Sequence, residues 1–349
     1  MLTARTTAPG SLVFEEVPQP RRGAGEALVR VCTVSLCGTD LHIFGGDFAT
    51  DLPLVQGHEM AGIVVEIDPA ADSPLRVGDR VAIDPLVACG TCRACRRGRS
   101  NVCAHLSVLG CYEDGGLAEL VSVPLHRLHR VPDGLGLDVA ALGEPASIAL
   151  QAVARAEPAE GDVALVLGCG PIGLLAALGL AERGVTVLAA DTDPARLAVA
   201  ARFGARHALR VDGVFPDPAQ AELLAQVTGA SGVDIVIEAT GVPASLENAV
   251  RLVGPGGTIV QVGISSRAAA ITLKDLTDKE IELRGSRNSR GLIPDGLAML
   301  ARHPEATAAL LTHRFPFAEL EAALRLMADP TEPSGKIVVL LPTGEEEAA

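Results

Sequence analysis

VALVLGCGPIGLLAALGLA, residues 163–181, is the stretch of the chain that decides its fold. It contains no charged residue and is about as long as a membrane span. Three glycines and a proline interrupt it within the six residues GCGPIG, at 168–173. Glycine and proline break a continuous helix, so the pattern favours a buried strand, a turn and then a helix over 172–183.

The turn has the form G-x-G-x-x-G between a predicted strand and a predicted helix, which is the context of a dinucleotide-binding turn. Gly168 permits the tight turn, Gly170 lets the backbone approach a pyrophosphate, and Gly173 lets helix and strand pack closely. Pro171 and Ile172 open the helix, whose free N–H groups face the phosphates. The alternative is a glycine turn in an unrelated α/β protein.

The next predicted strand ends at Asp191, eighteen residues after Gly173. A carboxylate at this position accepts hydrogen bonds from the hydroxyls of the adenine ribose and repels a 2′-phosphate, so it predicts NAD rather than NADP. Arg196 is expected to lie over the adenine. A solvated position on its helix face is the alternative.

Apolar strands alternate with Ala- and Leu-rich helices around this turn. Asp193 and Pro194 suit the N-cap and first position of one helix, and Gly204 suits its end. The pattern predicts an α/β fold with a doubly wound parallel sheet of the Rossmann type. The expected strands are 163–167, 185–190, 233–239 and 258–263, and the expected helices are 172–183, 194–203 and one opening near Pro243.

The regions on either side have a different pattern. Residues 1–150 have the alternation of short strands, at 26–34, 61–67, 80–84 and 117–123, and are expected to be all-β. Helices at 294–302 and 317–327 and a strand at 336–341 are expected near the C-terminus, followed by a disordered acidic tail with Glu345 to Glu347. We therefore predict domains 1–150 and 151–286 and a C-terminal return over 287–349.

Composition narrows the possible partners. The 349 residues carry 29 basic and 43 acidic side chains, a net charge of −14, and no basic block. Such a chain is repelled by nucleic acid and by anionic membranes, so neither is expected as a partner. Residues 1–12 contain no apolar segment long enough for a secretory signal, which predicts a cytoplasmic protein. Because disulfides are rare in the cytoplasm, clustered cysteines in such a protein indicate metal binding.

Four of the eight cysteines lie within fifteen residues, at Cys89, Cys92, Cys95 and Cys103. Four thiolates close a tetrahedral zinc shell and leave no position for substrate, so a structural zinc is predicted. Arginines interleaved with them offset the negative charge of the thiolates. Unliganded thiols and a nucleic-acid knuckle are the alternatives.

A second set of metal-binding residue types is dispersed over three motifs. These are Cys37-Gly-Thr-Asp-Leu-His42, Gly57-His58-Glu59-Met-Ala-Gly62 and Gly143-Glu144-Pro145. Each residue alone is more often packed or exposed than a metal ligand. Their order, together with the four-cysteine segment and the glycine turn, resembles that of the zinc-dependent medium-chain alcohol and polyol dehydrogenases. The resemblance extends from Val13 to Leu341.

The resemblance implies a GroES-like β-rich catalytic domain beside the Rossmann domain. It implies that Cys37 and His58 bind a catalytic zinc, with Glu59 as a direct or intermittent ligand. Glu144 stands where the alcohol-specific branch has a second cysteine, as in the sorbitol, threonine and sugar-acid dehydrogenase branch. Asp40 is expected to orient His58 through its far ring nitrogen. The remaining thiols, Cys32, Cys111 and Cys169, are interpreted as packing residues.

The resemblance also implies a proton path and further contacts. Thr39 and His42 would carry the substrate proton to solvent, the alternatives being a helix cap for Thr39 and a plain surface residue for His42. Val262 and Ile264 are expected to contact the cofactor. The expected substrate-lining residues are Phe44, Phe48, Tyr112 and the segment Ser286, Arg287, Asn288, Ser289 and Arg290.

These expectations predict an oxidoreductase with two zinc ions per chain. It would oxidise a secondary alcohol of a polyol or sugar acid to the ketone, with hydride transfer to NAD. An L-threonine 3-dehydrogenase and a non-catalytic nucleotide-binding relative are the alternatives. The regions 258–263 and 274–283 resemble the family's subunit contact, which predicts a homodimer or homotetramer.

Overall fold

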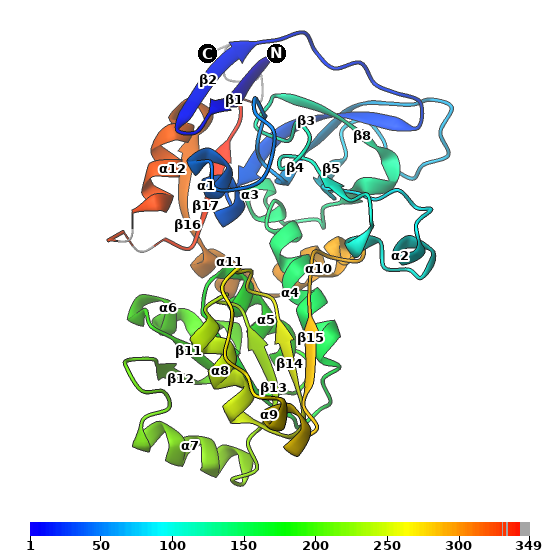
Figure 1. The fold of residues 1–349 in the computed structure, drawn as a ribbon. Coiled ribbons are helices and arrows are strands. Elements are labelled where there is room, and N and C mark those ends of the chain that lie inside the picture. The colour runs from blue at the N-terminus through cyan, green and yellow to red at the C-terminus, as the bar shows by residue number, and fades with distance from the viewer. Residues whose placement is uncertain (330, 333, 343–349) are drawn as a thin grey trace. The chain divides into compact units, whose positions relative to one another are not determined.

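The chain folds into two compact units in a computed structural model that describes residues 1–329, 331–332 and 334–342. The discontinuous unit comprises Met1–Ser147 and Arg290–Ala349, and the central unit comprises Ile148–Ser289. Figure 1 colours the central unit from green to orange. The predicted boundaries after residues 150 and 286 stay predictions. The predicted acidic tail at residues 345–347 lies outside the described residues.

The central unit is built on a six-stranded parallel sheet in the order β12-β11-β10-β13-β14-β15. The strands are β10 (Val163–Leu167), β11 (Thr186–Asp191), β12 (Ala205–Arg210), β13 (Val233–Glu238), β14 (Val253–Gln261) and β15 (Glu282–Gly285). The order reverses between β10 and β13, which is the topological switch point where open α/β sheets bind ligands. The predicted doubly wound sheet is confirmed.

Helices connect these strands. They are α5 (Pro171–Ala181), α6 (Pro194–Val199), η3 (Ala200–Phe203), α7 (Pro218–Thr228), α8 (Pro243–Leu252) and α9 (Leu273–Asp278). The Asp193 side chain accepts from the amide of Ala195 at 2.8 Å, and Gly204 has φ 82°, as expected for the cap and the end of the predicted helix 194–203. That helix tightens into a 3₁₀ turn after Val199.

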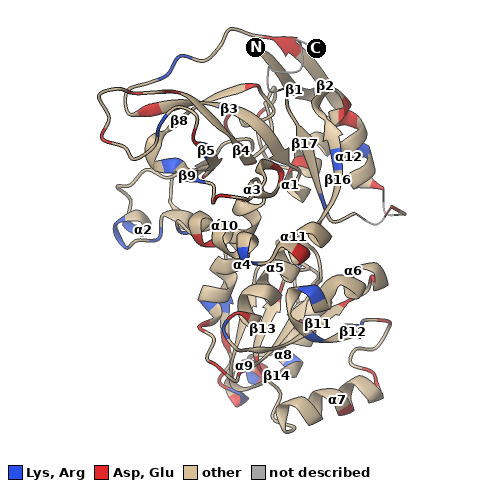
Figure 2. Cartoon of the chain, turned by 180° about the vertical axis from the view of Figure 1, so that it is seen from behind, with Lys and Arg blue, Asp and Glu red and all other residues tan. Residues whose placement is uncertain are grey.

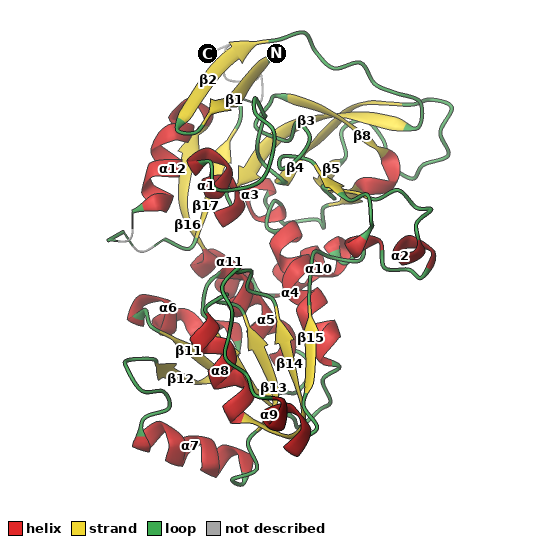
Figure 3. Ribbon diagram, in the orientation of Figure 1, coloured by secondary structure: helices red, strands yellow, loops and turns green. Residues whose placement is uncertain are grey.

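The discontinuous unit contains a seven-stranded mixed sheet in the order β16-β17-β3-β4-β5-β9, with β8 also paired to β3 (Figure 3). These strands are β3 (Glu26–Ser35), β4 (Glu59–Ile67), β5 (Arg80–Ile83), β8 (Leu120–Pro124), β9 (Leu128–Arg130), β16 (Leu311–Pro316) and β17 (Lys336–Leu340). Two further pairs are β1 (Leu2–Ala8) with β2 (Ser11–Glu16) and β6 (Leu86–Val87) with β7 (Ser107–Val108).

The expectation that residues 1–150 are all-β is wrong. This region also contains α1 (Gly38–Gly45), α2 (Arg93–Arg96), α3 (Leu137–Ala140), the start of α4 (Gly143–Ala156) and the 3₁₀ turns η1 (Ser100–Val102) and η2 (Leu125–Arg127). Leu137–Ala156 is long and apolar enough to cross a membrane, but 67% of its most apolar window is buried within the protein, as in a core helix. A search for the alternating pattern of strands does not detect this segment, because its apolar residues recur with the period of a helix.

The C-terminal part of the chain completes the sheet and core of the discontinuous unit. β17 pairs antiparallel with β3, placing Val339 opposite Val34. Buried Phe317 and Leu320 pack in the same apolar core as Val34 and Met60. The accompanying helices are α10 (Ile293–Arg302), α11 (Pro304–Leu310), η4 (Phe317–Glu319) and α12 (Leu320–Ala328).

Candidate metal centres and nucleotide site

The four cysteines at 89–103 lie together in the discontinuous unit, around α2. Their sulfurs are all within 4.8 Å of one another, with Cys89 and Cys103 at 3.4 Å and Cys92 and Cys103 at 3.9 Å. Four sulfurs bound tetrahedrally at ~2.3 Å from a zinc ion are about 3.8 Å apart. The spacing of these thiols therefore fits a closed four-thiolate site.

Backbone amides surround these sulfurs. The amide of Cys92 donates to Cys89 Sγ at 3.3 Å, and that of His105 donates to Cys103 Sγ at 3.3 Å. Hydrogen bonds from the backbone of Thr91 and Cys92 lower the pKa of the Cys89 thiol to about 5. Figure 2 shows the basic residues of α2, which lies within this segment, in blue. Amides and arginines both stabilise the thiolate form that zinc binds.

A second group of possible metal ligands consists of Cys37, His58 and Glu59, whose ligand atoms lie within 4.8 Å of one another. Cys37 follows β3 and is the N-cap of α1, while His58 precedes β4 and Glu59 begins it. Because β3 and β4 pair antiparallel, with Ser35 opposite Glu59, the two motifs meet at one end of the pair. His58 and Glu59 are buried, so their polar groups need partners.

Asp40 joins these two motifs through the backbone. Its Oδ2 accepts from the amide of Cys37 at 2.8 Å, in a capping box, and its Oδ1 accepts from the amide of Gly57 at 3.3 Å. The expected hydrogen bond to His58 is not formed, since Asp40 Oδ1 and His58 Nδ1 are 3.8 Å apart. Asp40 therefore holds the segments that carry the ligands, and acts on the imidazole ring by charge. Burial lowers the pKa of His58, but the Asp40 carboxylate and Cys111 outweigh it and leave that pKa well above its usual value.

Lys336 is a site residue that sequence reasoning missed. Its ammonium group donates to both carboxylate oxygens of Glu59, at 2.5 and 2.6 Å, and to the carbonyl of Leu36 at 3.1 Å. The two side chains are 5% and 1% exposed. Burial lowers the pKa of Lys336, but the charges of Glu59 and Cys37 more than offset this and raise it. The pair spans 277 residues, so no local pattern could have indicated it.

Glu144 lies in the first turn of α4. It is not part of the compact group formed by Cys37, His58 and Glu59. Desolvation by the surrounding protein raises the pKa of Glu144 to about 7, with His58 opposing and Glu59 adding to the shift. The carboxyl group of Glu144 therefore interacts electrostatically with His58 and Glu59, although its oxygens are not within 4.8 Å of all three ligand atoms.

The expected proton-path residues lie on α1. The Thr39 hydroxyl is 3.9 Å from Cys37 Sγ, and the capping box of α1 is formed by Cys37 and Asp40, so Thr39 is not the capping residue. His42 is largely exposed, and its Nδ1 is 2.9 Å from Asp47 Oδ2. Thr39 and His42 stand three residues apart on the helix, a spacing that places them on one face.

Cys111 is buried, as expected of a packing residue, but it has a second contact. It packs with Ile43 and Leu54, and its Sγ is 3.6 Å from His58 Nδ1. Cys32 and Cys169 are also buried. The single cysteine of the sequence GCYED gave no signal of its proximity to His58.

The glycine turn of the central unit has the geometry its sequence predicts. Gly168 has φ 96°, and a Cβ on Gly173 would lie 1.8 Å from the carbonyl oxygen of Gly168. A Cβ on Gly170 would meet nothing within 4 Å, so this glycine leaves open space beside the backbone. Gly170 is the N-cap of α5 and Pro171 its first residue, followed by Ile172. The turn therefore offers an open helix N-terminus that fits a pyrophosphate.

Asp191 ends β11 beside this turn. Its Oδ2 accepts from the amide of Cys169 at 2.6 Å and its Oδ1 from the amide of Asp193 at 2.8 Å. Each oxygen keeps a lone pair for a further donor. Arg196 lies half-exposed on α6, with its Nε 3.6 Å from Asp193 Oδ2, and its position over an adenine stays a prediction.

Val262 and Ile264 follow β14. The amide of Val262 donates to the carbonyl of Glu238 at 2.8 Å, whereas the side chain of Ile264 is 84% exposed. An apolar side chain so exposed is available to a ligand or to another chain. Their cofactor contacts stay predictions.

The expected substrate residues are distributed over both units. The rings of Phe48 and Tyr112 lie 5.6 Å apart, and Phe48 packs beside Cys111, while Phe44 packs against the core of the discontinuous unit. The segment from Ser286 to Arg290 crosses the boundary between the units. Its role at a substrate stays a prediction.

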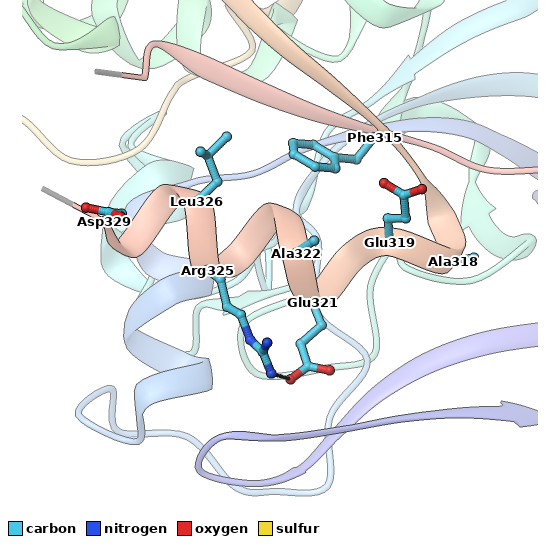
Figure 4. Close-up of a pocket in the computed structure, with 8 residues that line it drawn as sticks. All are labelled: Phe315, Ala318, Glu319, Glu321, Ala322, Arg325, Leu326 and Asp329. Atoms are coloured by element: carbon cyan, nitrogen blue, oxygen red, sulfur yellow. Dashed lines mark hydrogen bonds and ion pairs between the residues drawn. The ribbon is translucent and has the colours of Figure 1, made fainter. Parts of the chain in front are cut away.

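A groove of about 640 Å³ lies elsewhere, along α12 and the end of β16 (Figure 4). Arg325 and Glu321 form an ion pair at its edge at 2.6 Å, and Phe315 and Leu326 supply apolar lining. No predicted site residue lines it.

Two family models match the chain. Residues 23–133 match the alcohol dehydrogenase GroES-like domain, and residues 171–302 match the zinc-binding dehydrogenase domain. The L-galactonate-5-dehydrogenase of Escherichia coli K12 is 38% identical over 89% of this chain and 91% of its own length. The D-altritol 5-dehydrogenase of Agrobacterium fabrum is 37% identical over 89% of this chain and 91% of its own length.

Solved structures agree with these matches. A protein of Escherichia coli CFT073, described as a short chain alcohol dehydrogenase complexed with NADH, superposes with a TM-score of 0.89 at 32% identity. The match covers 97% of this chain and 99% of that one.

Proposed function

The chain belongs to the zinc-containing medium-chain alcohol dehydrogenase family, and from this premise we propose that it oxidises a secondary alcohol of a hexonate or hexitol with NAD as hydride acceptor. It is a zinc-dependent dehydrogenase of the polyol and sugar-acid type, which excludes the non-catalytic alternative. The relatives at 37–38% identity are named for oxidation at position 5 of a sugar acid and of a polyol. That shared position supports the substrate class.

The donor set fits a catalytic zinc. One thiol, one imidazole and one carboxylate within 4.8 Å form a three-ligand site of the kind that leaves a position open for substrate. Cys37, His58 and Glu59 would hold the ion, and Glu144 would act directly or through water. The thiols at Cys89, Cys92, Cys95 and Cys103 would hold a structural ion.

When bound, zinc supplies a Lewis acid that stabilises negative charge on the substrate oxygen, and NAD supplies the hydride acceptor. The Thr39 hydroxyl, beside Cys37, would accept the proton from the substrate hydroxyl and donate its own onward. His42, exposed and paired with Asp47, would release the proton to water.

The central unit would bind the cofactor at the carboxyl ends of its strands, across the switch point between β10 and β13. Gly168, Gly170 and Gly173 would hold the pyrophosphate, and Asp191 would accept from the adenine ribose. The remaining lone pairs of Asp191 support this role, and its negative charge supports NAD over NADP.

We also propose a homodimer or homotetramer in which two copies meet through the edge strand β15. β15 ends the sheet of the central unit, and Leu283 on it is 43% exposed. An exposed edge strand is a template for pairing with a second copy. A cytoplasmic location stays a prediction.

The decisive experiment measures NAD reduction with hexonates, hexitols, L-threonine and simple alcohols, together with metal content. Turnover of hexonates or hexitols and about two zinc ions per chain are expected. Preference for L-threonine would refute the substrate class. Retained turnover in zinc-free His58→Ala protein would refute the catalytic assignment.

A further inference from the structure

Glu238, the last residue of β13, is a fully buried carboxylate in the central unit, 0% exposed. Its Oε1 accepts from the amide of Thr240 at 2.9 Å and from the Thr240 hydroxyl. Its Oε2 accepts from the amide of Gly241 at 3.1 Å and from Gln261 Nε2 at 2.5 Å. These four donors are neutral, so hydrogen bonds rather than a cation stabilise the charge.

The chemistry of this arrangement requires a carboxylate. Each partner donates, so the residue at 238 must accept with both oxygens. An amide would turn an NH₂ group toward at least one donor, leaving a buried donor unpaired at the cost of its desolvation. Charge-assisted bonds of this kind are also stronger than neutral ones.

The carboxylate joins two loops at the carboxyl edge of the sheet. Thr240 and Gly241 belong to the loop between β13 and α8, and Gln261 ends β14. The carbonyl of Glu238 also accepts from the amides of Val262 and Gly263, at 2.8 and 3.0 Å. One residue therefore fixes the backbone after both strands.

Gln261 is oriented by these contacts. Its Nε2 donates to Glu238 and to the carbonyl of Gly263 at 2.8 Å, which leaves Oε1 as a buried acceptor without a partner among the described residues. The hydroxyl of Ser286, the residue after neighbouring β15, is likewise buried and has no partner within the part of the chain that the structure describes. The two residues are neighbours, since the amide of Ser286 donates to the carbonyl of Gln261 at 2.9 Å. Both lie at the carboxyl ends of their strands, which is the edge where open parallel sheets bind ligands.

The two halves of a dinucleotide lie on opposite sides of the switch point. Asp191 ends β11 on one side, which assigns that side to the adenine half. β13 and β14 lie on the other side and are left for the nicotinamide half. We propose that Glu238 is a positioning residue for the nicotinamide half, because it locks together the loops after β13 and β14. This inference rests on the proposed function.

The test compares two ligands by isothermal titration calorimetry. NADH probes both halves of the site, and ADP probes the adenine half alone. Glu238→Gln is expected to weaken NADH binding by about tenfold and to leave ADP binding within about twofold of the wild type. Glu222→Gln, the same change at an exposed position on α7, is expected to leave both affinities unchanged.

A second variant keeps the test decisive if Glu238→Gln does not fold. Gln261→Met removes one donor to the carboxylate while keeping side-chain length, and is expected to weaken NADH binding selectively. Unchanged NADH affinity, or an equal loss for NADH and ADP, would overturn the positioning role. Failure of the wild type to bind NADH would instead refute the proposed function.

Discussion

Replacing Lys336 by methionine tests the buried ion pair that supports the candidate metal centre. Methionine keeps most of the length of the side chain but removes its charge and three donated hydrogen bonds. In the metal-free protein, the carboxylate of Glu59 then stays buried without a cation. We expect Lys336→Met to destabilise the discontinuous unit far more than the loss of a surface ion pair would.

The magnitude follows from the burial of the pair. With exposures of 5% and 1%, solvent cannot screen the unpaired carboxylate. Breaking a buried pair by removing one partner costs about 3–5 kcal/mol. The exposed pair between Arg325 and Glu321, in the same unit, provides the control, because Arg325→Met should cost less than about 1 kcal/mol.

The assay uses the single tyrosine of the chain. Tyr112 lies in the discontinuous unit and the chain has no tryptophan, so intrinsic fluorescence reports the unfolding of that unit alone. Urea titrations are made on metal-free protein with a chelator present throughout, so that differences in zinc affinity between the variants do not enter the comparison. The double variant Lys336→Met/Glu59→Gln should recover much of the loss, because it no longer buries an unpaired charge.

A loss below about 1 kcal/mol for Lys336→Met would refute the reasoning. It would mean that water or another group satisfies Glu59 once the lysine is gone. A double variant no more stable than Lys336→Met would likewise show that the loss does not arise from the unpaired carboxylate.

Three further outcomes are expected. Cys92→Ser should lower the Tm and reduce the zinc content by about one ion per chain, as thermal melts and metal analysis would show. Cys37→Ser should instead abolish turnover in an NAD-reduction assay while the thermal melt shows that the fold is kept. Asp191→Ala should lower the NAD to NADP ratio of kcat/KM by about tenfold, and an unchanged ratio would contradict the ribose contact. Burial lowers the pKa of His129, so the unfolded chain takes up its proton first and stability falls as the pH drops below about 6.5. His129→Phe should flatten that decline in urea midpoints measured against pH.

The local features of the fold were predictable because each depends on a few neighbouring residues. The glycine turn, the Asp193 cap and the strand ending at Asp191 occur where spacing and residue type require them. The helix α4 was missed because residues 1–150 were interpreted by the strand pattern of their other segments. The strand β15 is four residues long and gave no periodic signal.

The candidate metal centre was predictable as a set of residue types and not as a set of contacts. Motif order indicated Cys37, His58 and Glu59, which the fold brings together. Lys336 could not be inferred, since its partner is remote in sequence and a lysine in a strand has no distinctive pattern. Asp40 was assigned to the imidazole ring, but its carboxylate accepts from the backbone amides of Cys37 and Gly57 instead.

The pairing of β17 with β3 affects how the protein is made. Val338 pairs with Ser35, so the sheet that begins in the first part of the chain is completed only when residues translated roughly 300 codons later emerge. The central unit is continuous and can fold as soon as it leaves the ribosome. At bacterial or eukaryotic elongation rates, the interval between synthesis of Ser147 and of Leu340 is about 10–40 s. During that time β3 lacks β17 along residues 33–35, and the unpaired backbone groups of this edge are a template for wrong pairing with another chain.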